Sequence, residues 1–301
     1  MNWVLELRTE FWSNVFKWFP LLASDYFYIT IIALGYWLSH SRVHQVRSSE
    51  SLFRSLGFLV PFATLLNCLL KNCFKIPRPD ATLHLITVHD KFGFPSGDVQ
   101  VAVIFWGCIM LGLKSKLKYL CLIPVIGIAI SRVYLGVHSI YDVAGGAVIG
   151  LIIIYLWKKY LENYLFKNHT RSAKRYWSLL VASVLIYALV SQNLTWPPMV
   201  AIAIGALTGF GISWKFLLSK GEFTERSEHG QNVTKFQNKY GAISLPRALL
   251  SLGVIIIMAL TIPIMKENEL LLNLTLILKY SIITFSIFYL IPKANELRKI
   301  D

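Results

Sequence analysis

Nine apolar runs, most of them long enough to cross a lipid bilayer, constrain this chain of 301 residues more than any other feature. With 55% hydrophobic residues and a mean hydropathy of +0.55, the composition excludes a soluble protein of this length. Because a chain in lipid must pair its own backbone groups, the sequence predicts an all-α, polytopic membrane helical bundle. The runs cover about residues 20–39, 52–70, 99–113, 117–131, 140–157, 176–192, 197–218, 248–265 and 270–291.

The distribution of basic residues predicts the orientation of these spans. If successive loops alternate between the two sides of the membrane, 21 of the 30 Lys and Arg residues fall on one side, which the positive-inside rule places in the cytoplasm. The polar segment near 219–247 then becomes a cytoplasmic loop. The net charge of +14 follows mostly from topology, so it implies no nucleic-acid partner. The other side holds eight basic residues: Arg8, Lys17, Lys71, Lys75, Arg78, Lys91, Arg132 and Lys266.

Five of these eight residues lie in just two loops, one after the second run and one after the fourth. The first of these loops also holds the segment FPSGD, at Phe94–Asp98, and the second holds SRVYLGVHSIYD, at Ser131–Asp142. Because both loops connect spans of matching parity, they emerge on the same face of the membrane. We therefore expect their polar side chains to meet.

Three short patterns in these loops occur in a fixed order. Lys71–Pro79 fits K-x-x-x-x-x-x-R-P, Pro95–Gly97 opens P-S-G-H, and Ser131–Asp142 fits S-R-x-x-x-x-x-H-x-x-x-D. Together they resemble the three-part signature of the type 2 phosphatidic acid phosphatase superfamily. The resemblance implies a six-span phosphatase core at residues 20–192. It leaves an N-terminal segment at 1–19 and a C-terminal extension of about three spans at 193–301.

The third pattern can be explained from the residues themselves. His138 and Asp142 are four positions apart, so on a helix that opens the fifth span they share one face. Asp142 can then accept a hydrogen bond from one imidazole nitrogen and leave the other free to attack phosphorus, which gives a phosphohistidine. The alternative is a His and an Asp that only satisfy each other at the end of a span.

Lys71, Arg78 and Arg132 are cations placed where apolar spans meet water. Each one alone is typical of an interfacial residue whose charged head reaches out of the membrane. With Ser96 and the backbone N–H of Gly97 they form the set that a transferring phosphoryl group requires, because its charge spreads over three oxygens. The resemblance implies that all five bind phosphate. The sequence shows no metal-ligand set, and the family needs no metal or other cofactor.

Asp98 departs from the pattern, because the family has a His at this position that donates a proton to the departing oxygen. A carboxylate beside three cations is ionised at neutral pH and has no proton to give, although the charge of a bound phosphate would favour the protonated form. Three interpretations stay open: a working acid, a lost acid in an enzyme that still cleaves good leaving groups, or an inactive binding protein. His84 and His89, in the same loop, are alternative acids or ordinary polar loop residues.

The sequence thus predicts a membrane enzyme that hydrolyses a phosphate monoester or diphosphate of a lipid. Candidate substrates are phosphatidate, phosphatidylglycerol phosphate and a polyprenyl diphosphate. A lipid phosphotransferase and a binding or carrier protein are the alternatives. The expected partners are the lipid and the bilayer. Gly146-x-x-x-Gly150 and Gly205-x-x-x-Gly209 allow close helix contact within the chain or in a homo-oligomer. We expect a bacterial inner membrane with the site on the extracytoplasmic face, or the endoplasmic reticulum in a eukaryote.

Overall fold

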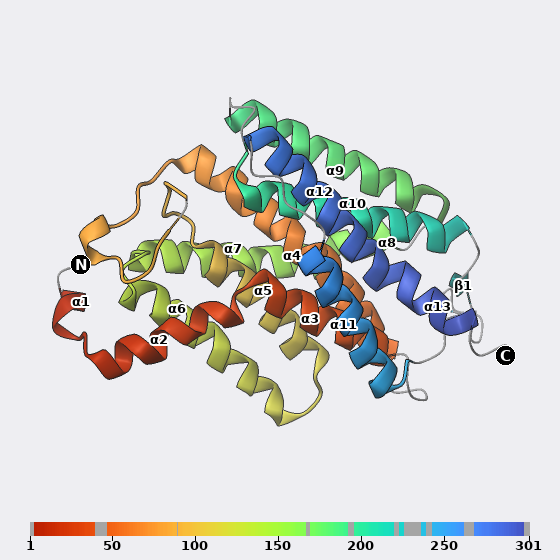
Figure 1. Ribbon diagram of the computed structural model, residues 1–301, viewed down its shortest axis with the longest axis horizontal. Helices are drawn as coiled ribbons and strands as arrows, with labels where there is room; N and C mark the ends of the chain where they lie inside the picture. Colours follow the sequence, from red (N-terminus) through yellow and green to blue (C-terminus); the bar gives the residue numbers. More distant parts are fainter. Residues whose placement is uncertain are drawn as a thin grey trace.

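The computed structural model describes residues 3–39, 47–88, 90–166, 169–191, 196–219, 223–225, 236–238, 243–261 and 268–297. Nearly all of these residues are helical (Figure 1), which confirms the predicted all-α bundle. In chain order the elements are α1 (Trp3–Glu6), α2 (Glu10–Leu22), α3 (Asp25–Leu38), α4 (Arg47–Phe74), η1 (Ala81–Leu83), α5 (Gly97–Gly112), η2 (Lys116–Cys121), α6 (Leu122–Tyr134), α7 (Ile140–Leu156), η3 (Trp157–Leu161), α8 (Glu162–Phe166), α9 (His169–Ser191), α10 (Pro198–Ser219), β1 (Phe223–Glu225), β2 (Phe236–Asn238), α11 (Leu245–Thr261), α12 (Glu269–Phe285), η4 (Ser286–Leu290) and α13 (Ile291–Leu297).

Each of the nine apolar runs coincides with a helix, but helix length supports fewer full spans. Among the described residues, six helical stretches are long and apolar enough to cross a membrane, and the bent pair α2–α3 raises the number to seven. Helices α5 and α11 are apolar but shorter, with 16 and 17 residues. In α5 most of the first three turns are buried, so this helix is covered by its neighbours as well as by lipid. The chain is a multi-pass membrane protein.

The pair α2–α3 bends by 50° at the point where the first apolar run begins. Pro20 lies near the end of α2, and Ser24 starts α3 as its N-cap, with its hydroxyl accepting a hydrogen bond from the N–H of Phe27 at 3.3 Å. The N-terminal segment therefore continues as a helix into the first apolar run. The predicted boundary at residue 19 falls inside α2.

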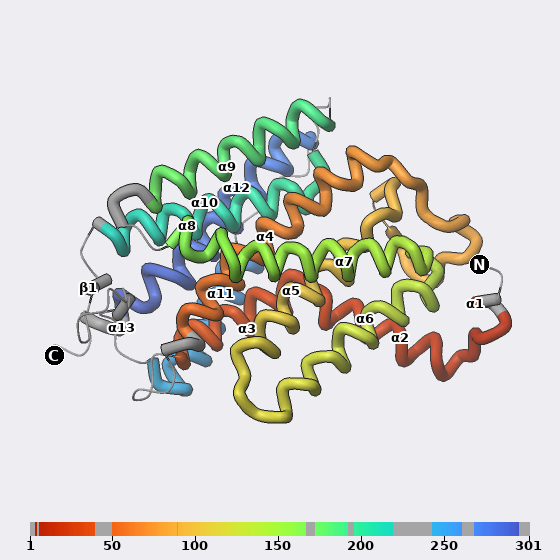
Figure 2. The backbone as a smooth tube through the Cα atoms, turned by 180° about the vertical axis from the view of Figure 1, so that it is seen from behind, coloured from red at the N-terminus to blue at the C-terminus, as the bar shows by residue number. Residues whose placement is uncertain are grey.

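Helix α5 lies at the centre of the core, packed between α4, α6 and α7 (Figure 2). Two glycines let α7 approach it closely. A Cβ on Gly146 would lie 2.5 Å from the carbonyl oxygen of Ser96, and one on Gly150 would lie 2.9 Å from that of Gln100. The close approach fixes the start of α5 against the first turns of α7.

The C-terminal extension packs on the opposite side of α4, where α10 and α12 lie together with α9, the last helix of the predicted core (Figures 1 and 2). Its closest helix pair, α10 with α12, is also built on glycine, since a Cβ on Gly205 would lie 2.5 Å from the carbonyl oxygen of Ile277. Both Gly-x-x-x-Gly motifs thus contact helices of the same chain. Homo-oligomerisation stays a prediction.

Aromatic rings join the extension to the core. Phe58 of α4 packs against Tyr176 of α9 and Phe210 of α10, and Phe210 packs in turn against Phe288 of η4. The indole N–H of Trp37 donates to the carbonyl of Ile287 at 2.9 Å. These contacts make one continuous apolar core. In the predicted cytoplasmic loop near 219–247, β1 and β2 pair antiparallel, and most of the loop lies outside the described residues.

Candidate active site

Asp142 lies in the first turn of α7, whereas His138 precedes the N-cap Ser139 and lies outside the helix, so the two residues do not share a helix face as predicted. Ser139 is the N-cap of this helix, and it forms a capping box in which its N–H donates to Asp142 Oδ2 at 2.7 Å. The hydroxyl of Ser139 accepts from the N–H of Asp142 at 3.2 Å. The same Oδ2 atom lies 3.5 Å from His138 Nδ1. Asp142 is therefore held in place by the helix start while it faces the imidazole.

The other ring nitrogen of His138 points to the predicted phosphate-binding cations. Its Nε2 atom lies 3.1 Å from Nη1 of Arg78, and the ring is only 2% exposed. Burial lowers the pKa of His138; Asp142 raises it in part, and the charges of Arg78 and Lys71 lower it again. The net pKa lies below the ordinary 6.5, so the imidazole is neutral at pH 7. A neutral ring with one nitrogen facing a carboxylate is the form that can act as a nucleophile.

Lys71 and Arg78 are brought together by the end of α4 and the loop that follows it. Arg78 is fixed by its guanidinium, which donates from Nη1 to the carbonyl of Val137 at 2.7 Å. Both cations also form ion pairs with one side chain that the sequence reasoning missed, the carboxylate of Asp90. One signal could have pointed to it, because Asp90 lies next to Lys91 in a basic loop.

Ser96 is the N-cap of α5, but its hydroxyl accepts no hydrogen bond from a backbone N–H of the first helical turn. The residue is fully buried, and its Oγ has no hydrogen-bond partner within the part of the chain that the structure describes. Its own N–H donates to the carbonyl of Asp142 at 2.9 Å, which ties the loop to α7. A buried hydroxyl without an acceptor is costly unless a ligand supplies one.

Gly97 is the first residue of α5. It lies beside Asn67 and Gln100, two more residues that the sequence reasoning missed. A Cβ on Gly97 would lie 2.9 Å from Oδ1 of Asn67, so only glycine fits. The amide nitrogen of Asn67 donates to the carbonyl of Pro95 at 3.2 Å and to Oε1 of Gln100 at 2.8 Å. Both polar side chains are buried, and they hold the FPSG loop against α4.

Asp98 in the first turn of α5 forms an ion pair with Arg132, with 3.2 Å between Oδ2 and Nε. The side chain of Asp98 is 33% exposed, whereas that of Arg132 is 8% exposed. The negative charge of Asp98 also raises the pKa of His138, but its effect is smaller than those of burial, Asp142, Arg78 and Lys71. All three predicted cations therefore face a carboxylate in this structure.

Of the two alternative acids, His84 has no comparable position. The Nε2 atom of His84 lies 3.1 Å from the carbonyl of Pro79, a contact within its own loop. His89 lies outside the described residues. Among the residues that are described, no group of three or more His, Cys, Asp or Glu side chains is arranged to hold a metal ion.

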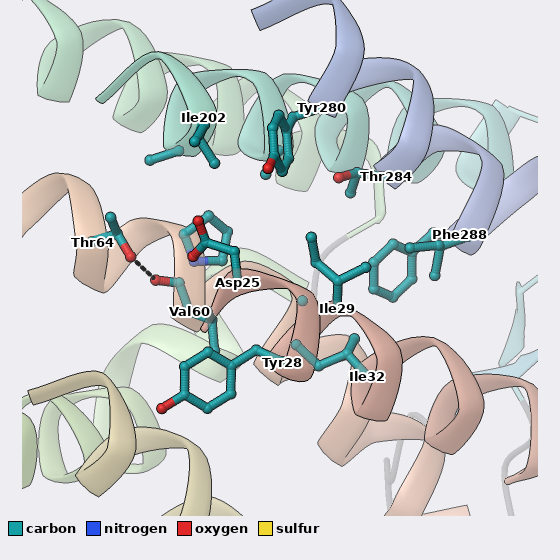
Figure 3. Close-up of a pocket in the computed structure, with 15 residues that line it drawn as sticks. Asp25, Tyr28, Ile29, Ile32, Val60, Thr64, Ile202, Tyr280, Thr284 and Phe288 are labelled. Atoms are coloured by element: carbon teal, nitrogen blue, oxygen red, sulfur yellow. Dashed lines mark hydrogen bonds between the residues drawn. The ribbon is translucent and has the colours of Figure 1, made fainter. Parts of the chain in front are cut away.

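A separate pocket lies where the extension meets the core (Figure 3). It is lined mainly by apolar side chains of α3, α4, α10 and α12, with Asp25 and Tyr280 among the polar ones. None of the predicted site residues lines it. The candidate active site is therefore the cluster of charged residues at the ends of α4, α6 and the starts of α5 and α7.

Comparison with known proteins finds a family match over part of the chain. Residues 53–166 match the model of the PAP2 superfamily, and this stretch contains every predicted site residue. Over these residues the chain is similar to the type 2 phosphatidic acid phosphatase superfamily. The match is shorter than the six-span core predicted at residues 20–192, and no solved structure matches the chain.

Three curated proteins are similar to parts of the chain. Phosphatidylglycerophosphatase B of Bacillus subtilis is 37% identical over 121 residues, which are 36% of this chain and 58% of that protein. Lipid phosphate phosphatase delta of Arabidopsis thaliana is 28% identical over 151 residues, or 44% and 34% of the two chains. Dihydrosphingosine 1-phosphate phosphatase YSR3 of Saccharomyces cerevisiae is 25% identical over 180 residues, or 54% and 42%. The chain spans less than two thirds of each relative.

Proposed function

We propose that this chain is a membrane-embedded lipid phosphatase that works through a phosphohistidine on His138. The observation that carries the proposal is the state of the imidazole. It is buried, with Nδ1 facing Asp142 and Nε2 facing Arg78, and burial lowers its pKa, which favours the neutral form. The names of the three similar proteins support a lipid phosphate as substrate.

In the proposed reaction, the Nε2 lone pair of His138 attacks the phosphorus atom, and the bond from phosphorus to the lipid oxygen breaks. The Nδ1–H donates to Asp142, which stabilises the positive charge that develops on the ring. Lys71, Arg78 and Arg132 balance the charge on the phosphoryl oxygens. Water then attacks the phosphohistidine, which releases inorganic phosphate and returns the lone pair to Nε2.

The hydroxyl of Ser96 and the N–H of Gly97 complete the proposed phosphate site. The buried Oγ of Ser96 lacks a partner among the described residues, and a phosphoryl oxygen would accept its hydrogen bond. The N–H of Gly97 lies in the first turn of a 16-residue helix, where the helix dipole favours an anion. Asn67 and Gln100 would keep both donors in place.

The ion pair between Asp98 and Arg132 bears on the choice of leaving group. The carboxylate of Asp98 is engaged by Arg132 in this ion pair, so we propose that it is not the proton donor for an alkoxide leaving group. A diphosphate needs little protonation, because its departing phosphate has a second pKa of about 6. We therefore propose that a polyprenyl diphosphate is cleaved faster than phosphatidate.

Phosphate release from defined lipids tests this function. Purified wild type should release inorganic phosphate from phosphatidate, phosphatidylglycerol phosphate or a polyprenyl diphosphate, and His138→Ala should release none. Transfer of the phosphoryl group to a second lipid without release would instead make the protein a phosphotransferase. Binding without either reaction would make it a carrier. Full activity in folded His138→Ala protein would exclude the phosphohistidine.

The proposed site faces away from the cytoplasm, on the basis of the distribution of basic residues. Single cysteines at Lys91 and Lys116, both exposed, test this in a background that lacks the four native cysteines. A thiol reagent that cannot cross the membrane should label only the cysteine at 91 in intact cells. Labelling only at 116 would place the site in the cytoplasm.

A further inference from the structure

We propose that Asp90 is a built-in competitor of the substrate, whose carboxylate takes the place of a lipid phosphate between Lys71 and Arg78. On this view Asp90 is a specificity-determining residue, because a substrate must carry enough charge to displace it. The inference rests on the proposed phosphatase function. It goes further by stating which class of lipid the site rejects.

The contacts of Asp90 are those expected of an anionic ligand. One carboxylate oxygen, Oδ2, contacts Nζ of Lys71, and the other, Oδ1, contacts Nη2 of Arg78. The backbone carbonyl of Asp90 also accepts from Nε of Arg78 at 3.1 Å. Two oxygens of one anion thus bridge two cations, which is how a phosphate group binds such a pair.

The position of Asp90 fits a ligand that approaches from outside. Its side chain is 32% exposed, whereas those of Lys71 and Arg78 are each 10% exposed. The carboxylate therefore covers the cations on their more open side. A lipid phosphate that entered the site would meet Asp90 before it met the cations.

The loop that carries Asp90 is anchored on both sides of it. The N–H of Leu85 donates to the carbonyl of Leu135 at 3.0 Å, and the N–H of Gly93 donates to that of Ile76 at 2.8 Å. Gly93 must be a glycine, because a Cβ there would lie 2.9 Å from Oδ2 of Asp142. With the backbone held at these points, rotation of its own side chain can move the Asp90 carboxylate away from the cations.

Charge decides which ligands can displace this carboxylate. Burial raises the pKa of Asp90, but Lys71 and Arg78 lower it by more, so its net pKa falls below the ordinary value. Asp90 is therefore ionised, with a single negative charge, at neutral pH. A phosphate monoester carries about −1.5 to −2 at pH 7 and competes well. A phosphodiester headgroup carries one negative charge and gains no such advantage.

This difference matters in a bilayer, where phosphodiester lipids surround the site at high local concentration. Without a competitor, their headgroups would occupy the cations and inhibit the enzyme. With Asp90 in place, only a terminal phosphate gains enough from Lys71 and Arg78 to bind. The opposite role is also testable: Asp90 could stay in contact and only position the two cations, and its loss would then weaken phosphate binding.

Asp90→Asn distinguishes the two roles, with Asp80→Asn as the matched control. Asp80 lies in the same loop, two residues after Arg78, and its carboxylate accepts from the N–H and hydroxyl of Thr82, at 2.9 and 2.8 Å. In detergent micelles, Asp90→Asn should lower both KM for phosphatidate and Ki for inorganic phosphate by on the order of tenfold. Phosphatidylglycerol, a phosphodiester, should become an inhibitor of Asp90→Asn while it leaves wild type and Asp80→Asn unaffected.

Direct calorimetric titration with inorganic phosphate separates failure of this inference from failure of the proposed function. If wild type binds phosphate and releases it from lipid, but Asp90→Asn binds it equally or more weakly, the competitor role is wrong and the phosphatase function stands. If neither protein binds phosphate or hydrolyses lipid, both proposals are overturned. Thermal unfolding of the three proteins in detergent checks that each variant is folded.

Discussion

The proposed phosphatase core and the C-terminal extension use the same kind of helix packing, but only the core holds the cluster of charged side chains. In the core, Gly146 and Gly150 bring α7 against the backbone carbonyls of Ser96 and Gln100 in and beside α5. In the extension, Gly205 brings α10 against α12 in the same way. The core contact involves the N-cap residue of α5, so close packing there positions the FPSG loop. Small residues in a membrane helix therefore indicate close packing, and the chemistry depends on what lies at the helix ends.

The largest effect should come from the carboxylate that the core packing holds in place. We expect Asp142→Asn to lower the rate of phosphate release by about 10²- to 10⁴-fold, because an amide cannot fix the tautomer of His138 or stabilise its positive charge. Asp142 also caps α7, so Ser139→Ala is the control, since it removes the other half of the capping box. Ser139→Ala should cost about 1 kcal/mol of stability and little activity. Equal losses of activity in both variants would show that Asp142 acts only as a cap.

A matched pair of glycine substitutions tests the difference between the two regions directly. Gly146→Leu and Gly209→Leu each place a side chain against a backbone carbonyl of the neighbouring helix, that of Ser96 and that of Ser281. Both should destabilise the bundle, by about 1–3 kcal/mol or more. Only Gly146→Leu should also reduce turnover per folded molecule, by on the order of tenfold to a hundredfold, because it displaces the start of α5.

Thermal unfolding and phosphate release, measured on the same preparations, separate stability from activity. A loss of turnover per folded molecule in Gly209→Leu as large as in Gly146→Leu would show that the extension takes part in the reaction. In that case the division between a catalytic core and a packing extension would be wrong.

Much of the fold could be predicted, because each apolar run reports directly on a helix. Where the structure describes them, all nine runs coincide with helices, and residues of the two motif loops contact each other, as the topology predicted. The number of full spans could not be obtained in this way. Helix α5, with 16 residues, is covered by its neighbours, and a buried helix need not match the bilayer.

Site residues could be predicted from the sequence where their contacts are close in the sequence. They were missed where the contacting residues are far apart in the sequence. The four-residue step from His138 to Asp142 indicated their contact. By contrast, Asp90 reaches Lys71 from 19 positions away, and Asn67 reaches Gln100 from 33 positions away. No periodicity links such pairs, so their partners became visible only with the tertiary structure.

A smaller effect should follow from Asp98, where the core departs from its family. We expect Asp98→His to raise phosphatidate hydrolysis by about tenfold, because an imidazole with a pKa near 6.5 can supply a proton at neutral pH. Hydrolysis of a polyprenyl diphosphate should change little. Asp98→Asn separates the remaining alternatives: if Asp98 works as an acid once substrate binds, this variant loses monoester activity. Identical substrate ratios and pH profiles in all three proteins would exclude any part of Asp98 in proton transfer.

The smallest effect is a shift in the acid limb of the pH profile. The reaction needs neutral His138 in the free enzyme, so kcat/KM should be retained above its pKa and lost as the pH falls through that pKa. Burial holds the pKa of His138 below 6.5, so we expect the limb to lie below pH 6.5. The carboxylate of Asp142 raises this pKa, so Asp142→Asn should move the limb to lower pH.

The substrate phosphate itself titrates near pH 6, but on one substrate that contribution is the same in every variant. Gly209→Leu, which alters only the extension, should keep the wild-type limb. If Asp142→Asn left the acid limb at the wild-type pH, titration of His138 would not cause the limb. The proposal that neutral His138 is the nucleophile would then be wrong.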